Sequence, residues 1–536
     1  MKEKPFFVDA AYLNLPVRPG APFSWVSLHE LDGGLLYEFY AELDFQNPAY
    51  YVSCPLERWR GRRLHLRIEG EGERGLEGLL PEPARNGWTR DPDSARPKVH
   101  FTPYRGVLGD PNGLYAMDGR YHAFFQHNPY GTQCGDWLDY CNFGWTPAVS
   151  GDLCRWREED PLLLPDKFGP AFSGTAFVDE ENASGMQEEG GPPPVLLFYT
   201  AAGGQSRRTR RDGIVQTQRL MVSTDGGRRF TPYAGNPVLP AVQWGNRDPK
   251  VFRHRESGRY ILVLYAGEGY RYFVYGSPDL LHWDCLSEFA WDDWECPDVL
   301  EVPLEGEDGG TQMVFWSARG YWAPVSFDGT AFTKLAPARL FAPGGHIQCG
   351  QSFTHLPGRC IQLHRFNVGD PRALWYGAFS LPYELTSARL ADGGYALRAR
   401  PAREVDALEI DTVTLEGVPA GEGAYSLPAV SPCRIRIEAE FGEDGELDLR
   451  FGGFSIQASR RMGSLAGNGL PVDIDMGGRL LLDIFWDGPL AEVFETHSGK
   501  VLPLVSMEEG PRTPQLSGRS AQWKRITCSA LSPGEA

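Results

Sequence analysis

Hydrophobic and polar residues alternate with a period of two along much of the chain, which is typical of half-buried β-strands. The alternation is clear in residues 34–43 and 63–68 and returns in residues 433–437 and 480–486. Gly-Gly and Asp-Gly turn signals separate the strands of the last region. The pattern predicts an all-β protein whose C-terminal part is an antiparallel β-sandwich.

The middle of the chain repeats itself. A Ser-x-Asp motif followed by an aromatic residue recurs, and a weaker fifth copy follows, at Ser150, Ser223, Ser277, Ser326 and Ser380. An apolar, aromatic-rich strand precedes each copy. The serines lie 73, 54, 49 and 54 residues apart, and the longest interval holds a Glu/Gly/Pro-rich insertion at 180–194. Repeats of about 40–50 residues are typical of propeller blades. The sequence therefore predicts five blades.

These changes of pattern divide the chain into three predicted domains. Residues 1–95 form an additional N-terminal β domain that ends in a Glu/Gly-rich and then Pro/Arg-rich linker, over 69–77 and 81–97. Residues 96–398 form the five-bladed β-propeller, and residues 399–536 form the C-terminal β-sandwich.

Charge excludes some classes of partner. The net charge is −18, with 70 acidic and 52 basic residues, which argues against binding to nucleic acid or to an anionic membrane. The one basic run, Arg207–Arg211, falls in a predicted loop. It is interpreted as a solvated turn, with a phosphorylated-sugar site as the alternative.

The ten cysteines contain no Cys-x-x-Cys pair, so neither a zinc nor an iron–sulfur site is indicated. The N-terminus has no apolar segment typical of a signal peptide, and no run of 18 apolar residues occurs. A cytoplasmic protein with reduced thiols is the simplest interpretation. A mature chain whose signal has been removed fits equally well.

Three acidic motifs carry the candidate chemistry: Gly-Asp110-Pro-Asn-Gly, Arg-Asp248-Pro-Lys and Glu295-Cys-Pro-Asp. The acids precede the serines of blades one, three and four by 40, 29 and 31 residues. Because the first strand of a blade lines the channel, we expect Asp110, Asp248 and Glu295 to meet at one channel mouth. Carboxylates gathered in this way are used to cleave acetals.

The motifs together resemble glycoside hydrolase family 32, the β-fructosidases, which include invertases, inulinases and levanases. The resemblance extends over most of the chain, through Tyr12–Val17, Arg96–Pro97, His100–Pro103, Asp110–Leu114, Gly119–His122, Gln126–Pro129, Phe172–Thr175, Arg247–Lys250, Glu295–Asp298, Asp487 and Glu492–Phe494.

The resemblance implies a role for each acid. Asp110 would be the nucleophile, and Glu295 would be the general acid and then the general base, with a raised pKa. Asp248 would hydrogen-bond the ring hydroxyls and stabilise the oxocarbenium-like state, while Arg247 and Lys250 would limit repulsion between the acids. The reacting carboxyls would lie about 5–5.5 Å apart, which gives retention of configuration. No metal or organic cofactor is expected.

Substrate contacts are expected from residues that match the family around the fructosyl subsite, namely Asn112, Gln126, Phe172, Ser173 and Arg247. Three segments depart from the family: Val107–Gly109 replaces Trp-Met-Asn, residues 134–145 lack the usual Trp/His pattern, and Pro343–Gly345 replaces Asp-x-Gly. The candidates for a rebuilt aromatic wall are Trp137, Trp145, Trp291 and Trp294.

The expected function is retaining, exo-acting release of fructose from a levan- or inulin-type fructan or fructo-oligosaccharide, with sucrose as a further candidate substrate. One alternative is a fructosyltransferase, including formation or breakdown of a difructose anhydride. Another is a non-catalytic fructan-binding protein. The only partner expected is the saccharide substrate, and the oligomeric state stays open.

Overall fold

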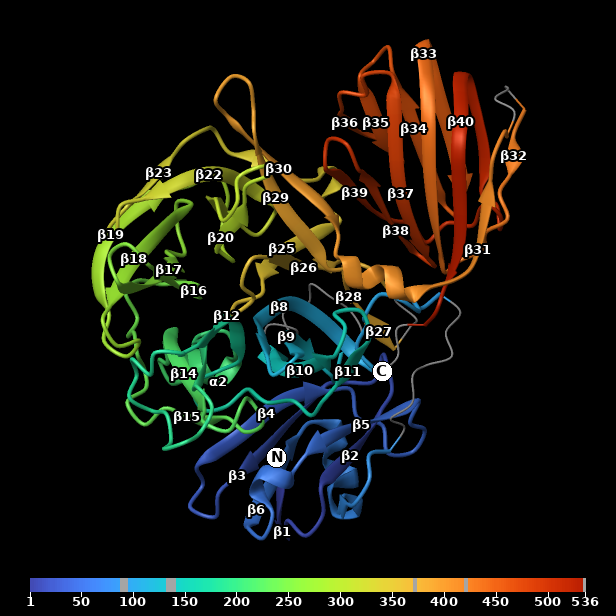
Figure 1. Cartoon of the computed structure of the whole chain (residues 1–536). Coiled ribbons are helices and arrows are strands. Elements are labelled where there is room, and N and C mark those ends of the chain that lie inside the picture. Colours follow the sequence, from blue (N-terminus) through green and yellow to red (C-terminus); the bar gives the residue numbers. More distant parts are fainter. Residues whose placement is uncertain (87–94, 132–140, 370–373, 419–422, 534–536) are drawn as a thin grey trace.

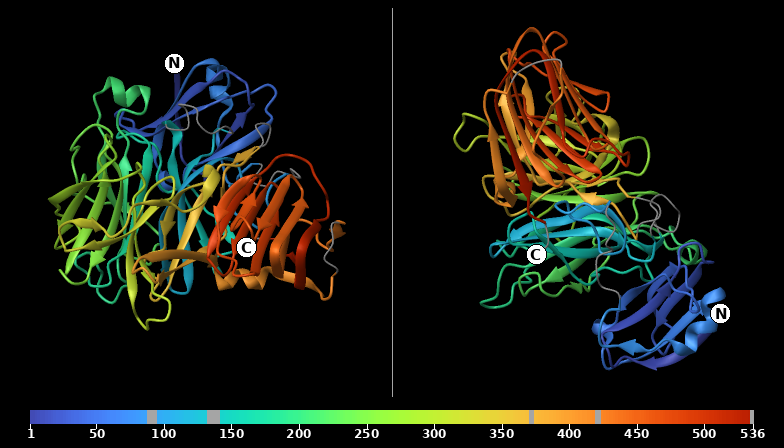
Figure 2. Two further views of the ribbon diagram at one scale, coloured as in Figure 1. Left: turned by 90° about the horizontal axis from the view of Figure 1, so that it is seen from above. Right: turned by 90° about the vertical axis from the view of Figure 1, so that its right-hand side faces the viewer.

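The computed structural model describes residues 1–86, 95–131, 141–369, 374–418 and 423–533. They form three β-rich parts, which the right panel of Figure 2 shows one after another, with the propeller between the N-terminal part and the C-terminal part. The fold confirms the predicted class, a five-bladed propeller with a β-sandwich and an additional N-terminal β domain (Figure 1).

The N-terminal part consists of two small sheets around one apolar core. The first sheet has the order β1 (Lys2–Phe7), β6 (Arg63–Glu69), β3 (Ser24–His29), β4 (Leu35–Ala41). The second has the order β5 (Tyr50–Pro55), β2 (Tyr12–Val17), β7 (Pro81–Glu82). Alternate residues such as Val26, Leu28 and Leu66 are buried in the core, as the period-two pattern predicts.

The predicted linker at 69–77 is wrong. A 3₁₀-helix, η2 (Glu71–Gly78), occupies this stretch, and a shorter one, η1 (Glu57–Trp59), precedes β6. Leu76 of η2 is fully buried in the N-terminal core. A single apolar residue among Glu and Gly gives no periodic signal, so the sequence pattern missed this packed turn.

Five sheets form the propeller ring, and Figure 1 shows their first strands nearest the centre. Blade one has β8 (Gly106–Met117), β9 (Arg120–Asn128), β10 (Gly144–Ser150) and β11 (Trp156–Glu158). Blade two has β12 (Ala171–Val178), β13 (Val195–Ala201), β14 (Thr217–Ser223) and β15 (Thr231–Pro232). Blade three has β16 (Arg247–His254), β17 (Arg259–Tyr265), β18 (Arg271–Ser277) and β19 (Asp284–Ala290).

The ring continues with two further sheets. Blade four has β20 (Asp298–Pro303), β21 (Thr311–Trp316), β22 (Tyr321–Phe327) and β23 (Phe332–Lys334), with β24 (Arg339–Leu340) also on β22. Blade five has β25 (Ile347–Ser352), β26 (Cys360–Phe366), β29 (Tyr383–Arg389) and β30 (Tyr395–Pro401), with β28 (Ala378–Phe379) on β26. The 3₁₀-helix η3 (Pro343–Gly345) precedes β25, and η4 (Arg403–Leu408) follows β30.

The repeated Ser-x-Asp motif has a local cause. In blades one to three the Asp carboxylate accepts backbone N–H groups two to four residues ahead, for example from Arg155 to Asp152 at 2.7 Å and from His282 to Asp279 at 2.9 Å. The serine hydroxyl donates to the same carboxylate, as Ser150 does to Asp152 at 3.1 Å. The motif is therefore the turn that leaves the third strand of a blade.

A short parallel strand closes the ring. Strand β27 (Trp375–Tyr376) follows β26 in the chain and pairs with β8, with Trp375 opposite Gly106. Thr354, beyond β25, donates its backbone N–H to Leu114 of β8 at 2.9 Å. Blade five is thus hydrogen-bonded to blade one, so the inner strands keep a fixed distance around the channel.

The C-terminal sandwich is built on two long strands, β33 (Cys433–Phe451) and β40 (Gln515–Leu531), which pair with each other. A register shift between Phe441 and Glu446 lets β33 change its second partner from β37 to β34. The remaining strands are β31 (Glu409–Leu415), β32 (Tyr425–Ser426), β34 (Phe454–Ser459), β35 (Ser464–Gly467), β36 (Leu470–Asp473), β37 (Arg479–Asp487), β38 (Leu490–Glu495) and β39 (Lys500–Val505).

The basic run at 207–211 forms a short helix, α2 (Arg207–Arg211), and not the predicted loop. Ser206 caps it by accepting the N–H of Thr209 at 3.1 Å. Arg208 pairs with the buried Glu38 of β4 at 2.9 Å, so the run attaches the propeller to the N-terminal domain. The phosphorylated-sugar alternative stays a prediction.

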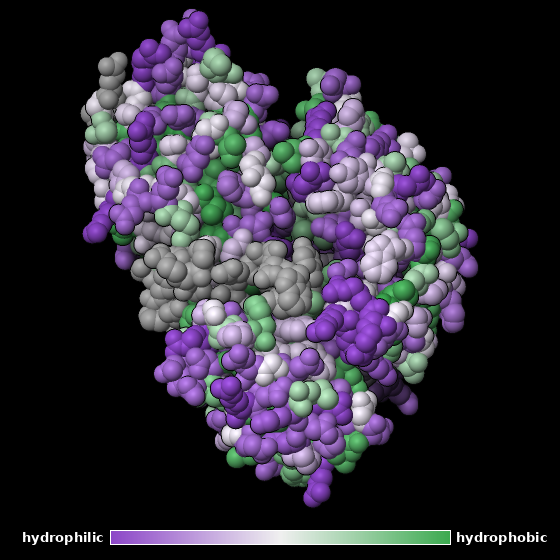
Figure 3. Space-filling view, turned by 180° about the vertical axis from the view of Figure 1, so that it is seen from behind, coloured by the Kyte–Doolittle hydropathy of each residue, from purple (hydrophilic) through white to green (hydrophobic). Residues whose placement is uncertain are grey.

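The surface is mainly polar. Figure 3 shows hydrophilic side chains over most of one face, and a notch between the sandwich, at upper left, and the propeller, at upper right. Within the described ranges, none of the helices has the length and apolar character needed to cross a bilayer.

A buried ion cluster joins the propeller to the sandwich. Asp487 accepts the backbone N–H of Val99 at 2.7 Å and lies 2.9 Å from His100 Nδ1, while His100 Nε2 lies 2.9 Å from Glu492. Burial alone would lower the pKa of His100, but the two hydrogen-bonded carboxylates outweigh it and raise the pKa to about 9. The imidazole is therefore a cation held between two buried anions.

We expect His100→Gln to lower the free energy of unfolding by about 3–5 kcal/mol at pH 6.5, because the variant leaves two buried carboxylates without their cation. The folded pKa of His100, about 9, is above its unfolded value of 6.5, so this stabilisation is complete below pH 6.5 and is lost as the pH rises through about 9. Urea unfolding of both proteins across this pH range measures the difference between their free energies of unfolding. The exposed His282→Gln is the control, and a difference that widens with rising pH would contradict the assignment.

Candidate active site

A small hollow of about 240 Å³ opens at the centre of the ring. All five blades or their leading turns contribute to its lining, which consists of Asp110, Pro111, Ser173, Gly174, Asp248, Pro249, Cys296, Pro297, Cys349, Gly350 and Gln351. Two of the three predicted acids thus face one cavity, and the third, Glu295, immediately precedes a lining residue.

The inner strands bend where they meet this hollow. Their pairing with the second strand shifts between Leu108 and Pro111 in β8, between Phe172 and Gly174 in β12, between Arg247 and Lys250 in β16, and between Gln348 and Gln351 in β25. A β-bulge turns side chains out of the regular alternation. Each shift falls beside a pocket residue, so the bulges direct side chains of neighbouring positions into the channel.

The backbone around the hollow is also strained. Four non-glycine residues here have positive φ: Asp248 (63°), Glu295 (34°), Cys296 (44°) and Cys349 (51°). Such conformations cost about 1–3 kcal/mol each and persist where the surrounding structure imposes them, which is common at functional sites. Four such residues around one cavity indicate that the surrounding structure holds the backbone there in a conformation that these residues alone would not favour.

Asp110 is held by donors on both carboxylate oxygens. Ser173 Oγ donates to Oδ2 at 2.8 Å, and Arg365 Nη1 donates to Oδ1 at 3.2 Å. The side chain of Asp110 is 12% exposed, so it is reachable from the cavity yet fixed in orientation. This arrangement suits a carboxylate that attacks a carbon from one defined direction.

The predicted substrate contacts behave differently from one another. Ser173 touches Asp110, and Gln126 Nε2 donates to Ser173 Oγ at 3.1 Å. Asn112 is fully buried: it donates to the Asp110 carbonyl at 2.9 Å and accepts from Gly174 N–H at 3.0 Å. The structure therefore gives Asn112 a positioning role instead of the predicted substrate contact.

Two further predictions concern aromatic residues. The side chain of Phe172 is buried at the bulge of β12, and its carbonyl accepts from Trp145 Nε1 at 3.0 Å. Trp137 lies outside the described residues. Trp145 and Trp291 are buried in blade cores, so their proposed place in an aromatic wall is wrong, whereas Trp294, beside Glu295, is 43% exposed.

Arg247 bridges two of the acids. Its Nε and Nη2 atoms donate to Glu295 Oε2 at 2.9 and 2.8 Å, and Nε lies 3.6 Å from Asp248 Oδ2. The guanidinium also lies over the Tyr265 ring, 4.7 Å from its centroid. Arg247 therefore limits repulsion between the carboxylates, as expected, and its side chain is 21% exposed. Its contact with substrate stays a prediction.

The two bridged acids have raised pKa values. Burial raises the pKa of Asp248 to about 7, with Arg247 opposing and with Glu295 and Asp110 adding repulsion. Burial likewise raises the pKa of Glu295, against the opposing charge of Arg247, and the Asp110 charge raises it further. A carboxyl that keeps its proton near neutral pH is able to act as a general acid.

Known proteins resemble this chain in sequence and in fold. A family model described as the glycosyl hydrolases family 32 N-terminal domain matches residues 100–352, which include all three acids. The part of the chain that holds the three acids is therefore similar to glycoside hydrolase family 32.

Two curated relatives and one solved structure illustrate the relationship. A levanase of Bacillus subtilis is 33% identical over 65% of this chain, and an invertase of Schizosaccharomyces pombe is 35% identical over 41%. These alignments span 53% and 38% of the relatives' own lengths, so the chain spans about half or less of them. An exo-inulinase from Aspergillus awamori superposes with a TM-score of 0.71 at 22% identity, covering 83% of this chain and 100% of that one, which shows the shared fold.

Sequence reasoning missed several residues of this site. Blade five supplies Cys349, Gln351 and Arg365, none of which belongs to a predicted motif. Trp244, 58% exposed and three positions before Arg247, was also overlooked. One signal in the sequence could have pointed to Cys349 and Gln351. Residues 347–352 occupy the position of the first strand in the fifth repeat, and the first strand of a blade lines the channel.

Lys250 serves a different purpose from the predicted one. It is buried, and its ammonium pairs with the fully buried Asp298 at 2.6 Å, while Asp298 also accepts from Ser352 and Gln362. The pair and the Ser352 hydroxyl connect the inner strands of blades three, four and five. The ammonium is thus paired with Asp298 and does not offset the charge of the three acids.

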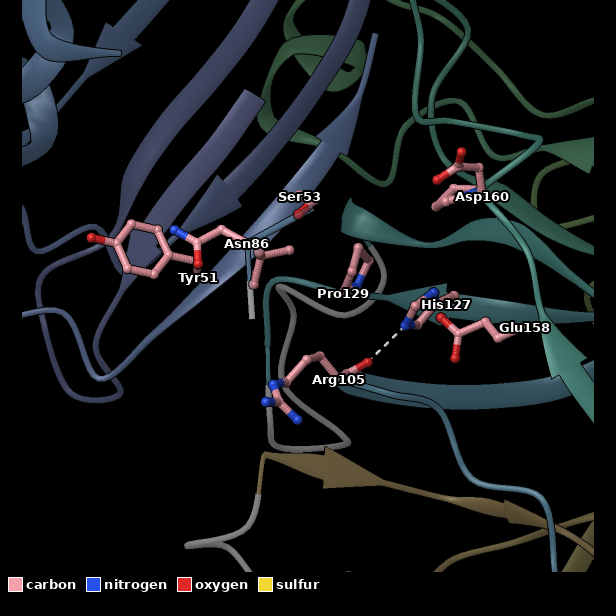
Figure 4. Close-up of a pocket in the computed structure, with 10 residues that line it drawn as sticks. Tyr51, Ser53, Asn86, Arg105, His127, Pro129, Glu158 and Asp160 are labelled. Atoms are coloured by element: carbon pink, nitrogen blue, oxygen red, sulfur yellow. Dashed lines mark hydrogen bonds between the residues drawn. The ribbon is translucent and has the colours of Figure 1, made fainter. Parts of the chain in front are cut away.

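A second hollow of about 420 Å³ lies between β5 of the N-terminal domain and blade one (Figure 4). His127 Nε2 lies 2.8 Å from the Arg105 carbonyl, and Tyr12 donates to Asp160 at 3.2 Å. Burial lowers the pKa of His127 to about 4, so this imidazole is neutral at pH 7. The hollow is a seam between domains and holds none of the three acids.

We expect Lys250→Met to destabilise the protein by about 3–5 kcal/mol, because Asp298 is left as an uncompensated buried charge. The double variant Lys250→Met/Asp298→Leu removes both charges and should recover part of that loss. Urea unfolding of the two variants and the wild type measures it. A double variant no more stable than the single one would contradict the interpretation.

Proposed function

We propose that this protein is a retaining β-fructosidase that releases terminal fructose from fructans, fructo-oligosaccharides or sucrose. The observation that carries the proposal is the meeting of Asp110 and Asp248 in one small pocket, with Glu295 next to a lining residue and bridged to Asp248 by Arg247. The match to the family 32 domain covers all three acids. The names of the relatives, levanase and invertase, support fructosyl substrates.

In the first step, an Asp110 oxygen attacks the anomeric carbon of the fructosyl unit. The bond to the leaving-group oxygen breaks as that oxygen takes the proton of Glu295, and a covalent fructosyl–Asp110 ester forms. Ser173 and Arg365 hold the attacking carboxylate in place. Arg247, hydrogen-bonded to Glu295, holds the acid in position.

In the second step, the Glu295 carboxylate removes a proton from water, and the water oxygen displaces Asp110 from the anomeric carbon. Two inversions give net retention. Asp248 accepts no covalent bond; it lies in the same pocket, where it is placed to accept hydrogen bonds from ring hydroxyls. Its backbone is fixed by the N–H bond to Thr200 Oγ1 at 2.9 Å.

The form of the site supports exo action. The hollow at the centre of the ring is small and has Asp110 and Asp248 among its lining residues, which suits one sugar ring. Glu295, 29% exposed, and the adjacent Trp294 lie toward solvent, where the leaving group would sit. The reaction would then remove one terminal unit at a time.

Fructosyl transfer is the second candidate. It uses the same covalent intermediate but replaces water with a sugar hydroxyl. The exposed rings of Trp244 and Trp294, next in sequence to the Arg247–Glu295 pair, provide planar faces on which an acceptor sugar could stack. Product analysis with sucrose and with a fructan separates the two: hydrolysis yields free fructose, whereas transfer yields longer saccharides from sucrose or a difructose anhydride from the fructan.

We also propose a cytoplasmic location. Nine cysteines of the described residues are free thiols, including Cys296 and Cys349 in the pocket. Free thiols persist in reducing compartments. In such a location short imported oligosaccharides are the expected substrates. Cell fractionation tests this proposal.

We expect Asp110→Asn to abolish fructose release and Glu295→Gln to reduce kcat by about 10²–10⁴-fold, because general acid–base catalysis contributes about that factor. The Glu295 variant should keep activity on β-fructosyl fluoride, whose leaving group needs little protonation, and azide should accelerate its turnover. Asp292→Asn, in the same loop but exposed and paired with Lys334, is the matched control. Undiminished fructose release by either acid variant would overturn the proposal.

We expect activity to fall as the pH rises above the raised pKa of Glu295, because the general acid must be protonated. Arg247 lowers that pKa, so Arg247→Gln should move the alkaline limb of the pH profile to higher pH. The measurement is the pH dependence of kcat/KM for both proteins. A limb that moves to lower pH would show that another group controls it.

A further inference from the structure

Two thiols and the nucleophilic carboxylate lie together on one side of the pocket. The sulfur atoms of Cys296 and Cys349 and a carboxylate oxygen of Asp110 all lie within 4.8 Å of one another. Cys296 Sγ is 3.6 Å from Asp110 Oδ2, and all three residues line the same hollow. The Cys296 thiol donates to Asp110 Oδ2 and to Asp248 Oδ2, and the reaction proposed above uses neither thiol as a reacting group.

The spacing matches that of metal ligands. Tetrahedral zinc, with Zn–S of about 2.3 Å and Zn–O of about 2.0–2.2 Å, requires ligand atoms roughly 3.5–3.8 Å apart. The 3.6 Å between Cys296 Sγ and Asp110 Oδ2 falls in this range, and the other pairs of ligand atoms lie within 4.8 Å. The left-handed backbone at both cysteines holds the sulfurs toward the cavity side.

The chemistry of the ligand set selects the ion. Thiolates prefer zinc and other soft cations over magnesium or calcium. Two thiolates and one carboxylate together carry more charge than a divalent cation, and a further oxygen, Asp248 Oδ2, lies 3.7 Å from Cys296 Sγ. Arg365 binds the other oxygen of Asp110, so Oδ2 is the oxygen that points toward the sulfurs.

We propose that Cys296, Cys349 and Asp110 form an inhibitory site for a thiophilic divalent cation such as Zn²⁺. The ion binds as both thiols release their protons to solvent, and no electron is transferred. Coordination takes Asp110 Oδ2 away from the anomeric carbon, so the loaded enzyme cannot form the covalent intermediate. The metal is not a cofactor of the reaction but an antagonist of it.

A cobalt titration of the reduced, full-length protein tests binding directly. We expect one Co²⁺ per chain, with a thiolate-to-cobalt charge-transfer band in the near ultraviolet and visible bands of tetrahedral Co²⁺, both removed by added Zn²⁺. Cys349→Ser removes one of the two thiolate ligands and should lose the charge-transfer band of the two-thiolate site. Cys285→Ser, which alters an exposed thiol of β19, is the control and should keep it.

Inhibition gives the second readout. Zn²⁺ should suppress fructose release, and EDTA should restore it. In Cys349→Ser the Zn²⁺ concentration for half inhibition, relative to the metal-free rate of that variant, should rise by at least about tenfold, since even outer-shell changes cost this much. Asp110→Asn should weaken Co²⁺ binding without abolishing the thiolate band.

The outcomes separate this inference from the proposed function. A wild-type protein without the charge-transfer band, or a Cys349→Ser variant with an unchanged band, overturns the metal site whatever the activity. A band that behaves as expected in a protein that releases no fructose keeps the site and refutes the fructosidase proposal.

Discussion

The active centre depends on one constraint: the first strand of each blade must pair with its neighbour and also present polar residues to a narrow channel. Regular alternation allows only every second side chain to face one way. The register shifts in β8, β12, β16 and β25 relax that restriction beside Asp110, Ser173, Asp248 and Cys349. Ring closure through β27 then fixes the distances between strands.

The charges of the centre are balanced unevenly, and the imbalance separates the roles of the acids. Asp110 has Arg365 on one oxygen and Ser173 on the other. Asp248 and Glu295 share the single guanidinium of Arg247, and burial raises the pKa of both. The three carboxyls thus have different hydrogen-bond and ion-pair partners, which the division of roles proposed above requires.

Much of the fold could be predicted because its signals are local. The Ser-x-Asp repeat marks the blades because its Asp accepts hydrogen bonds from a turn within the next four residues. The acids stand out because a proline follows each of them within two residues. Arg365, Cys349 and the Lys250–Asp298 pair gave no such signal, because their partners lie in other blades. The absence of Cys-x-x-Cys likewise could not reveal two thiols brought together by ring closure. Gly109, one of the positions where the sequence departs from the family pattern, has a reason that only the structure shows. A Cβ at this position would lie 2.8 Å from the Cβ of Gln126.

The cluster of His100, Asp487 and Glu492 has a consequence for synthesis on the ribosome. His100 and Asp487 are 387 residues apart in the chain. At about 5–20 residues per second, His100 emerges roughly 20–80 s before its partner is made. During that interval the propeller has an unpartnered histidine and an uncovered apolar face where Phe485 and Phe494 will later pack. The apolar face of the propeller is therefore exposed to solvent until the sandwich is synthesised. The sandwich is the part that finally covers it.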